Sequence, residues 1–142
     1  MGKTILLPVD LSDESSWRLA LREAVAMLRA GGGVLHVASV LPDFGMAMVG
    51  GYFKRDFEKE ALHRFGGALA EWARDHVPDD IEVHPHVLHG SIYHEILRAA
   101  DKLKADVIVI GSHRPELKDY LLGPNAARVV RHAKQSVYVV RE

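Results

Sequence analysis

The chain has 142 residues, with 18 basic and 19 acidic side chains, a formal net charge of −1 and no cysteine. We expect residues 1–142 to form a single domain, because this length supports one core. The charge balance argues against a general nucleic-acid binder, and the lack of cysteine excludes disulfides and a thiol nucleophile. No apolar run reaches the ~20 residues of a membrane helix and no signal-peptide pattern is present. We therefore expect a cytoplasmic protein without membrane contact.

The first third of the chain predicts a strand, a helix and a second strand. Residues 4–9 form a continuous apolar run, which is typical of a strand buried on both faces. Ser12 or Asp13 can then cap a helix, whose apolar side chains recur at helical spacing until the three glycines at 31–33 end it. Residues 34–41 predict the second strand.

The rest of the chain continues the same alternation. Residues 42–53 hold three glycines and large apolar side chains, and they predict a loop or a short helical piece. The elements expected after them are, in order, a long helix over 54–76, an alternating strand over 81–88 near a sheet edge, a helix over 91–104, a buried strand over 106–110, a loop to residue 123, a helix to about residue 133 and a last strand over 136–140.

Five strands joined by helical crossovers predict an α/β fold, with an open, mostly parallel sheet and helices on both faces. Ligands of such sheets bind beyond the carboxyl ends of the strands, where the strand order reverses. The candidate site residues are therefore the ends of three strands. They are Pro8, Val9 and Asp10 in the first strand, His36 and Val37 in the second, and Ile110 and Gly111 in the fourth.

The segment after the fourth strand carries groups that suit an anion. Gly111 allows a backbone to approach a ligand closely, and Gly123 precedes a helix whose first N–H groups are unpaired and favour negative charge. His113 and Arg114 add donors, and arginine can bind phosphate in a bidentate manner. Many α/β loops contain two glycines and an arginine, so these residues alone indicate an anion site without naming the anion.

The same segment resembles the signature of the universal stress protein family, Gly-x2-Gly-x9-Gly-(Ser/Thr), which binds ATP in part of that family. The likeness extends to residues 5–12, His36-Val37, Gly90-Ser91, residues 105–111 and the last strand. This resemblance implies a Rossmann-like fold with strand order 3-2-1-4-5. It also implies binding of ATP, or of AMP or ADP, with Mg²⁺ carried by the phosphates.

The resemblance also implies a role for each candidate residue. Asp10, followed by Leu11, faces the adenine–ribose side. His36 suits packing at the end of its strand, and contact with the base is its less favoured alternative. The apolar walls are Pro8, Val9 and Val37; Ile110 and Gly111 line the base and ribose; His113, Arg114, Gly123, Pro124, Asn125 and Ala126 surround the phosphates.

Two residues depart from the family signature. Arg114 replaces the second glycine, and Pro124, which has no N–H and no hydroxyl, replaces the Ser/Thr. We expect Arg114 and the amide of Asn125 to supply part of the lost phosphate contacts, with altered affinity.

Simpler interpretations stand beside these roles. Asp10 suits a helix cap as well as a ligand contact. His84 and His86 share one side of a strand, where an exposed face is favoured over a metal pair. Arg128 suits a solvated helix surface better than a phosphate contact.

Two functions are predicted. The first is an adenine-nucleotide-binding stress-response or regulatory protein that is not chiefly an enzyme. The alternative is a nucleotide-independent homodimeric interaction module. We expect at most slow ATP hydrolysis, because the chain has no Walker A motif and no nucleophile elbow. The last strand, residues 136–140, offers an unpaired edge, and the resemblance implies a homodimer through it.

Overall fold

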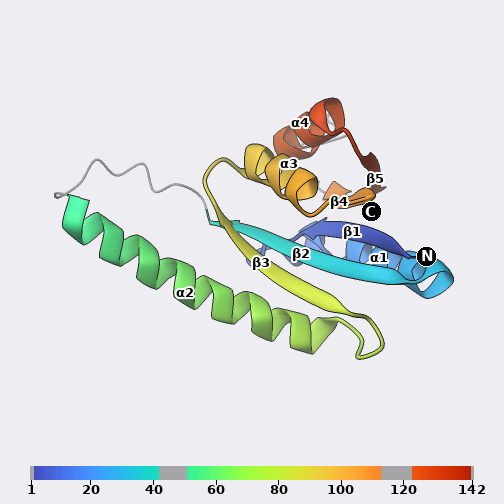
Figure 1. Ribbon diagram of the computed structural model, residues 1–142, viewed down its shortest axis with the longest axis horizontal. Helices are drawn as coiled ribbons and strands as arrows, with labels where there is room; N and C mark the ends of the chain where they lie inside the picture. The colour runs from blue at the N-terminus through green and yellow to red at the C-terminus, as the bar shows by residue number, and fades with distance from the viewer. Residues whose placement is uncertain (1, 42–50, 113–122, 142) are drawn as a thin grey trace.

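The computed structural model describes residues 2–41, 51–112 and 123–141. Strands and helices alternate along these residues as the sequence predicts (Figure 1). In chain order they are β1 (Lys3–Pro8), the 3₁₀ turn η1 (Glu14–Ser16), α1 (Arg18–Gly31), β2 (Gly33–Leu41), α2 (Gly51–His76), β3 (Val83–His89), α3 (Ile92–Lys102), β4 (Val107–Ser112), α4 (Pro124–His132) and β5 (Ser136–Arg141).

The strands form one open sheet in the order β3-β2-β1-β4-β5, and each neighbouring pair is parallel. The predicted fold class and strand order are thus confirmed. The chain moves outward from β1 to β2 and β3, and then returns to the other side of β1 for β4 and β5. The strand order therefore reverses between β1 and β4, which is where open parallel sheets bind their ligands.

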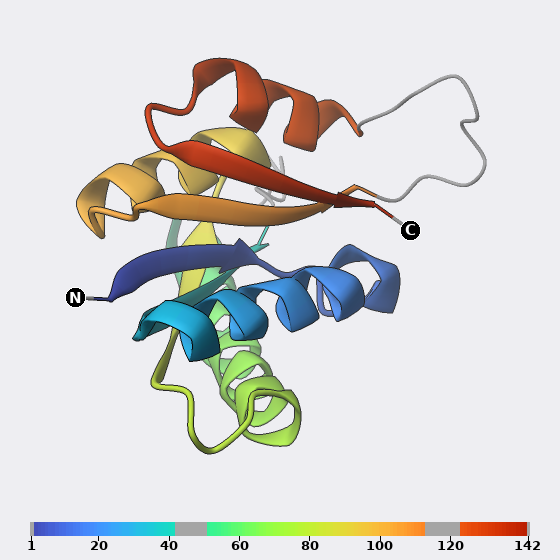
Figure 2. The same ribbon diagram turned by 90° about the vertical axis from the view of Figure 1, so that its right-hand side faces the viewer.

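Helices cover both faces of the sheet, α1 and α2 on one face and α3 and α4 on the other (Figure 2). Successive side chains of a strand point to opposite faces. Ile5 and Leu7 therefore pack with α1 and α2, whereas Leu6 packs with α3 and α4. Because both faces are covered, all three side chains are fully buried. This explains why the strand is a continuous apolar run.

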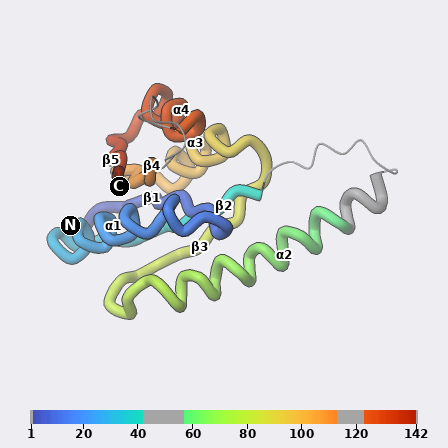
Figure 3. The backbone as a smooth tube through the Cα atoms, turned by 180° about the vertical axis from the view of Figure 1, so that it is seen from behind, coloured from blue at the N-terminus to red at the C-terminus, as the bar shows by residue number. Residues whose placement is uncertain are grey.

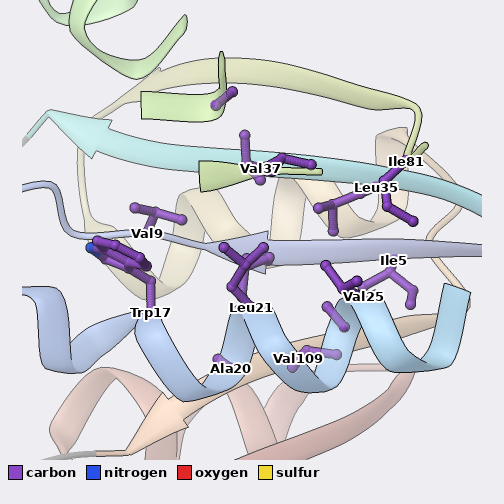
Figure 4. Packing of buried hydrophobic residues seen from close by; sticks show 14 of the residues in the cluster. Ile5, Val9, Trp17, Ala20, Leu21, Val25, Leu35, Val37, Ile81 and Val109 are labelled. Carbon is purple, nitrogen blue, oxygen red and sulfur yellow. The ribbon is translucent and has the colours of Figure 1, made fainter. Parts of the chain in front are cut away.

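Helix α1 packs its apolar stripe directly on the sheet (Figure 4). Leu21 and Val25 lie four residues apart on the buried side and face Ile5 and Val109. The packing continues to α2, which lies along β3 (Figure 3). Trp17, just before α1, meets Trp72 of α2 edge to face, with ring centroids 5.1 Å apart.

The element boundaries differ from the predictions at several points. Of the predicted loop over 42–53, residues 42–50 lie outside the described residues, and the last three belong to the first turn of α2. The side chain of Asp13 caps η1 by accepting a hydrogen bond from the Ser15 N–H, so α1 begins only at Arg18. The strand predicted from residue 81 begins at Val83, because the Ile81 N–H donates to the Pro78 carbonyl oxygen at 3.0 Å in the turn ahead of it.

Candidate functional site

A cavity of about 690 Å³ opens at the carboxyl ends of β1, β2 and β4. It lies where the strand order reverses, as the topology requires. Helices α2, α3 and α4 complete its walls. The predicted site residues that line it are Pro8, Val9, Asp10, Leu11, Ile110, Gly111, Gly123, Pro124, Asn125 and Ala126. Residues from three distant parts of the sequence therefore meet at one site.

The end of β1 is tied firmly to β2. The Val9 N–H donates to the Ala38 carbonyl oxygen at 2.8 Å. The Ser39 hydroxyl, which is buried, donates to the Val9 carbonyl oxygen at 2.7 Å. Both polar groups of the Val9 backbone are thus satisfied inside the protein. These bonds fix the floor of the cavity just before Asp10.

Asp10 is exposed at the cavity and closes a tight turn. Its Oδ1 accepts hydrogen bonds from the Ser12 N–H at 3.0 Å and from the Ser12 hydroxyl at 2.7 Å. Within the described part of the chain, its Oδ2 accepts no hydrogen bond. The structure therefore assigns helix capping to Asp13 rather than to Asp10, and one oxygen of Asp10 is left for a ligand.

The end of β4 is shaped by contact with η1. A Cβ built on Gly111 would lie 2.3 Å from the Ser16 carbonyl oxygen and 3.0 Å from the Ser16 carbonyl carbon. Real Cβ atoms do not approach backbone so closely. From the sequence, this glycine is expected to allow close approach by a ligand. In the structure, the close approach that requires a glycine is made by the protein's own backbone.

The N-terminus of α4 faces the cavity. Gly123 is its N-cap, Pro124 is the first helical residue, and among the described residues no side chain caps the helix. The first backbone bond is donated by Ala127 to the Gly123 carbonyl oxygen at 2.9 Å. The N–H groups of Asn125 and Ala126 have no partner within the helix, and both residues line the cavity. This end of the helix attracts negative charge.

The geometry does not bring His36 and Val37 to the cavity. The register pairs Pro8 with Ala38, so the β2 residues level with the end of β1 are Ala38, Val40 and Leu41, which line it instead. Val37 is fully buried in the core with α1. The predicted site placed β2's contribution too early in the strand.

His36 belongs to a histidine cluster on β2 and β3. Its Nδ1 lies 2.8 Å from Nε2 of His86, and its ring stacks on His84 at 5.3 Å between centroids. His84 is also bonded to Glu82 at 2.7 Å. Burial, followed by the charges of His86 and His84, lowers the pKa of His36. Burial also lowers the pKa of His86. No group of three or more His, Asp or Glu in the described ranges is arranged to hold a metal ion.

The remaining predicted residues fall into two groups. His113 and Arg114 lie outside the described residues. Arg128 is directed to α3, where its guanidinium carbon lies 4.8 Å from the centroid of the Tyr93 ring, a cation–π contact.

Part of the cavity wall is formed by residues that the sequence does not indicate as site residues. They are Ser12, Asp13, Ser16, Ala38, Val40, Leu41, Phe65, Ala68, Ile92, Ile96 and Ser112. The strand-end rule applied to the true end of β2 would have found Val40 and Leu41. Nothing in the sequence pattern indicates Phe65 or Ile96, because an apolar helix residue that lines a cavity has the same spacing as one that packs in the core.

An open parallel sheet with a cavity at its order reversal defines a Rossmann-like α/β protein. A model of the universal stress protein family matches residues 1–141, and the chain belongs to this family. Universal stress protein G of Escherichia coli O157:H7 is 36% identical over 143 residues, which cover 99% of this chain and 100% of that protein.

Solved structures share the fold. The universal stress protein UspA from Lactobacillus plantarum aligns with a TM-score of 0.76 and 22% identity, covering 98% of this chain and 97% of that one. A universal stress protein in complex with cAMP aligns with a TM-score of 0.61 and 22% identity, covering 99% and 97%. One from Archaeoglobus fulgidus in complex with dAMP aligns with a TM-score of 0.59 and 24% identity, covering 96% of each chain.

The described helices include none with the length and apolarity needed to cross a membrane.

Proposed function

We propose that this protein binds an adenine nucleotide, ATP first and AMP or ADP as well, and acts in the cytoplasm as a stress-response or regulatory protein rather than chiefly as an enzyme. The observation that carries the proposal is the cavity itself, which joins an apolar wall, an available carboxylate oxygen and a helix N-terminus at the reversal of strand order. Two structural neighbours are complexes with cAMP and dAMP, and both ligands are adenine nucleotides.

The base and ribose are assigned to the β1 side of the cavity. Val9, Ala38 and Ile110 are buried apolar residues that suit the face of a purine ring. The free Oδ2 of Asp10 accepts a hydrogen bond from an amino or hydroxyl group of the ligand. Leu11, next to it, closes the same side.

The phosphates are assigned to α4. The N–H groups of Asn125 and Ala126 are available there, and Pro124 supplies none. From the sequence, His113 and Arg114 add positive donors, and Mg²⁺ arrives with the triphosphate. Because Arg114 acts on charge, Arg114→Ala is expected to weaken ATP far more than AMP, and equal weakening would refute that role.

Weak catalysis is expected from the side chains at hand. Among the described residues that line the cavity, the ionisable side chains are Asp10 and Asp13, and histidine, lysine and arginine are absent. A general base needs a position within hydrogen-bond reach of the group that it deprotonates and a pKa tuned to the task. Oδ1 of Asp10 is engaged with Ser12, and no basic side chain among the described lining residues stands beside its Oδ2 to tune it as a base.

Isothermal titration with ATP, ADP and AMP tests the proposal. We expect saturable heat, and in Asp10→Ala an affinity about 10- to 100-fold lower, because a hydrogen bond to a charged group is lost. The matched control is Asp79→Ala, an exposed acid outside the cavity. No heat with any of the three nucleotides at millimolar concentration would overturn the proposal.

The alternative, a nucleotide-independent homodimeric module, has its own observation. β5 is an edge strand of the described sheet, and Tyr138 on it is 39% exposed. An apolar edge favours pairing with a second copy, so we propose a homodimer through residues 136–140. Light scattering after size exclusion is expected to give a dimer mass for the wild type and a monomer for Tyr138→Lys. Phe57→Lys, on α2 across the sheet, is the control that should stay dimeric, and a monomeric wild type would exclude the interface.

A further inference from the structure

Ser16 touches both strand ends that form the cavity floor. Its hydroxyl oxygen accepts a hydrogen bond from the Asp10 N–H at 3.1 Å and lies 3.3 Å from the Asp10 carbonyl oxygen, to which it donates. Its own carbonyl oxygen lies against the Cα of Gly111, with no room for a Cβ between them. Ser16 also lines the cavity. A single residue therefore bridges the ends of β1 and β4.

The chain from Asp10 to Ser16 is a closed turn. The Asp13 N–H donates to the Asp10 carbonyl oxygen at 3.0 Å, and the Ser16 N–H donates to the Asp13 carbonyl oxygen at 3.0 Å. The Ser16 hydroxyl closes the turn by returning to both main-chain polar groups of Asp10. Because Asp10 lies two residues beyond Pro8, the last residue of β1, the sheet alone does not fix its main-chain orientation.

The orientation of that main chain decides where the carboxylate lies. Asp10 is exposed, so packing does not hold its side chain, and Ser12 restrains only Oδ1. A ligand that bonds to Oδ2 depends on a fixed direction of the Cα–Cβ bond. Small displacements of a binding group cost affinity, because the hydrogen bond is sensitive to distance and angle.

We propose that Ser16 is a positioning residue of the nucleotide site: its hydroxyl orients Asp10, and its backbone, packed on Gly111, sets the spacing between the ends of β1 and β4. This inference rests on the proposed function. Ser16 is not assigned a contact with the nucleotide; it acts through Asp10.

The matched pair of variants is Ser16→Ala and Ser15→Ala. The Ser15 hydroxyl donates to Asp13 Oδ1 in the same turn, so it is also a hydrogen-bonded serine, but Ser15 neither bonds to Asp10 nor lines the cavity. Titration calorimetry is done with adenosine and with ATP. We expect Ser16→Ala to lose about fivefold in affinity for both, the effect of one neutral hydrogen bond, and Ser15→Ala to match the wild type. Ser16→Thr, which retains the hydroxyl, should restore binding.

Repeating the Ser16→Ala change in an Asp10→Ala variant distinguishes an effect on the position of Asp10 from a general loss of structure. In Asp10→Ala, the further change Ser16→Ala should leave the affinity unaltered, since no carboxylate remains to orient. Equal affinities for Ser16→Ala and Ser15→Ala, or the same fivefold loss in the Asp10→Ala background, would overturn the inference while the proposed function stands. A wild-type protein that binds neither adenosine nor ATP overturns the proposed function, and this inference with it.

Discussion

Replacing Gly111 by alanine tests the contact between β4 and η1. The added Cβ would lie 2.3 Å from the Ser16 carbonyl oxygen. Real Cβ atoms essentially never come within 3.0 Å of another heavy atom, so this distance is 0.7 Å too short. The obstructing atoms are backbone, so a side-chain rotation cannot relieve the clash, and η1 or β4 must shift. Overpacking of this kind costs about 1–3 kcal/mol.

The melting temperature measures that cost. In a domain of this size, 1 kcal/mol corresponds to roughly 4 °C, so Gly111→Ala should melt about 4–12 °C below the wild type. The matched control is Gly67→Ala in α2, where a Cβ would meet nothing within 4 Å. That change replaces a helical glycine by a better helix former, so its melting temperature should be equal or higher. Equal melting temperatures of Gly111→Ala and Gly67→Ala would refute the close contact between Gly111 and the Ser16 backbone.

Two further predictions concern the hydrogen bonds of the sheet. Ser39→Ala leaves the buried Val9 carbonyl without its hydroxyl donor, and we expect the free energy of unfolding to fall by about 1–3 kcal/mol in urea titration; Ser12→Ala, on the exposed turn, should cost less, and an equal loss would contradict the assignment. For the histidine cluster, burial places the folded-state pKa values of His36 and His86 below the unfolded value near 6.5. The charges of His86 and His84 act in the same direction on the pKa of His36, where Glu82 opposes them, and those of His84 and Lys102 do so on the pKa of His86. The unfolded chain therefore binds more protons below about pH 6.5, and stability should fall as the pH drops through that window. Comparing urea midpoints at about pH 7.5 and 5.5, His86→Gln should show a smaller drop than the wild type, and an unchanged drop would contradict this origin.

The fold was accessible from the sequence because its signals are local. Residues 4–9 and 106–110 show no alternation, which indicates strands covered on both faces, and the helical crossovers require parallel pairing. The first and last residues of the helices and strands were harder to predict from the sequence. Ile81 is apolar and so extends the apparent strand, yet it is buried in the core ahead of β3.

The site was accessible only in part, because a cavity is a tertiary feature. Strand ends could be located, so Asp10 and Gly111 were expected at the edge of the sheet where they line the cavity. The register that brings Ala38 level with Pro8 depends on the pairing of distant strands. The reason why residue 111 must be a glycine could not be predicted from the sequence either. A glycine in a loop motif suggests a ligand, and only the packed structure shows the Ser16 backbone beside it.

The two tryptophans of the chain, Trp17 and Trp72, both lie in the layer formed by α1, α2 and the sheet. Their emission therefore reports on that layer alone. The opposite layer, built on Leu6, Ile96 and Val129, contains no tryptophan, and Tyr93 packs against it. Replacing Tyr93 by tryptophan in a Trp17→Phe, Trp72→Phe background would move the reporter to the opposite layer, so comparing its unfolding with that of the wild type observes the two sides of the sheet separately. Coincident transitions would show that both sides lose their structure in a single cooperative step.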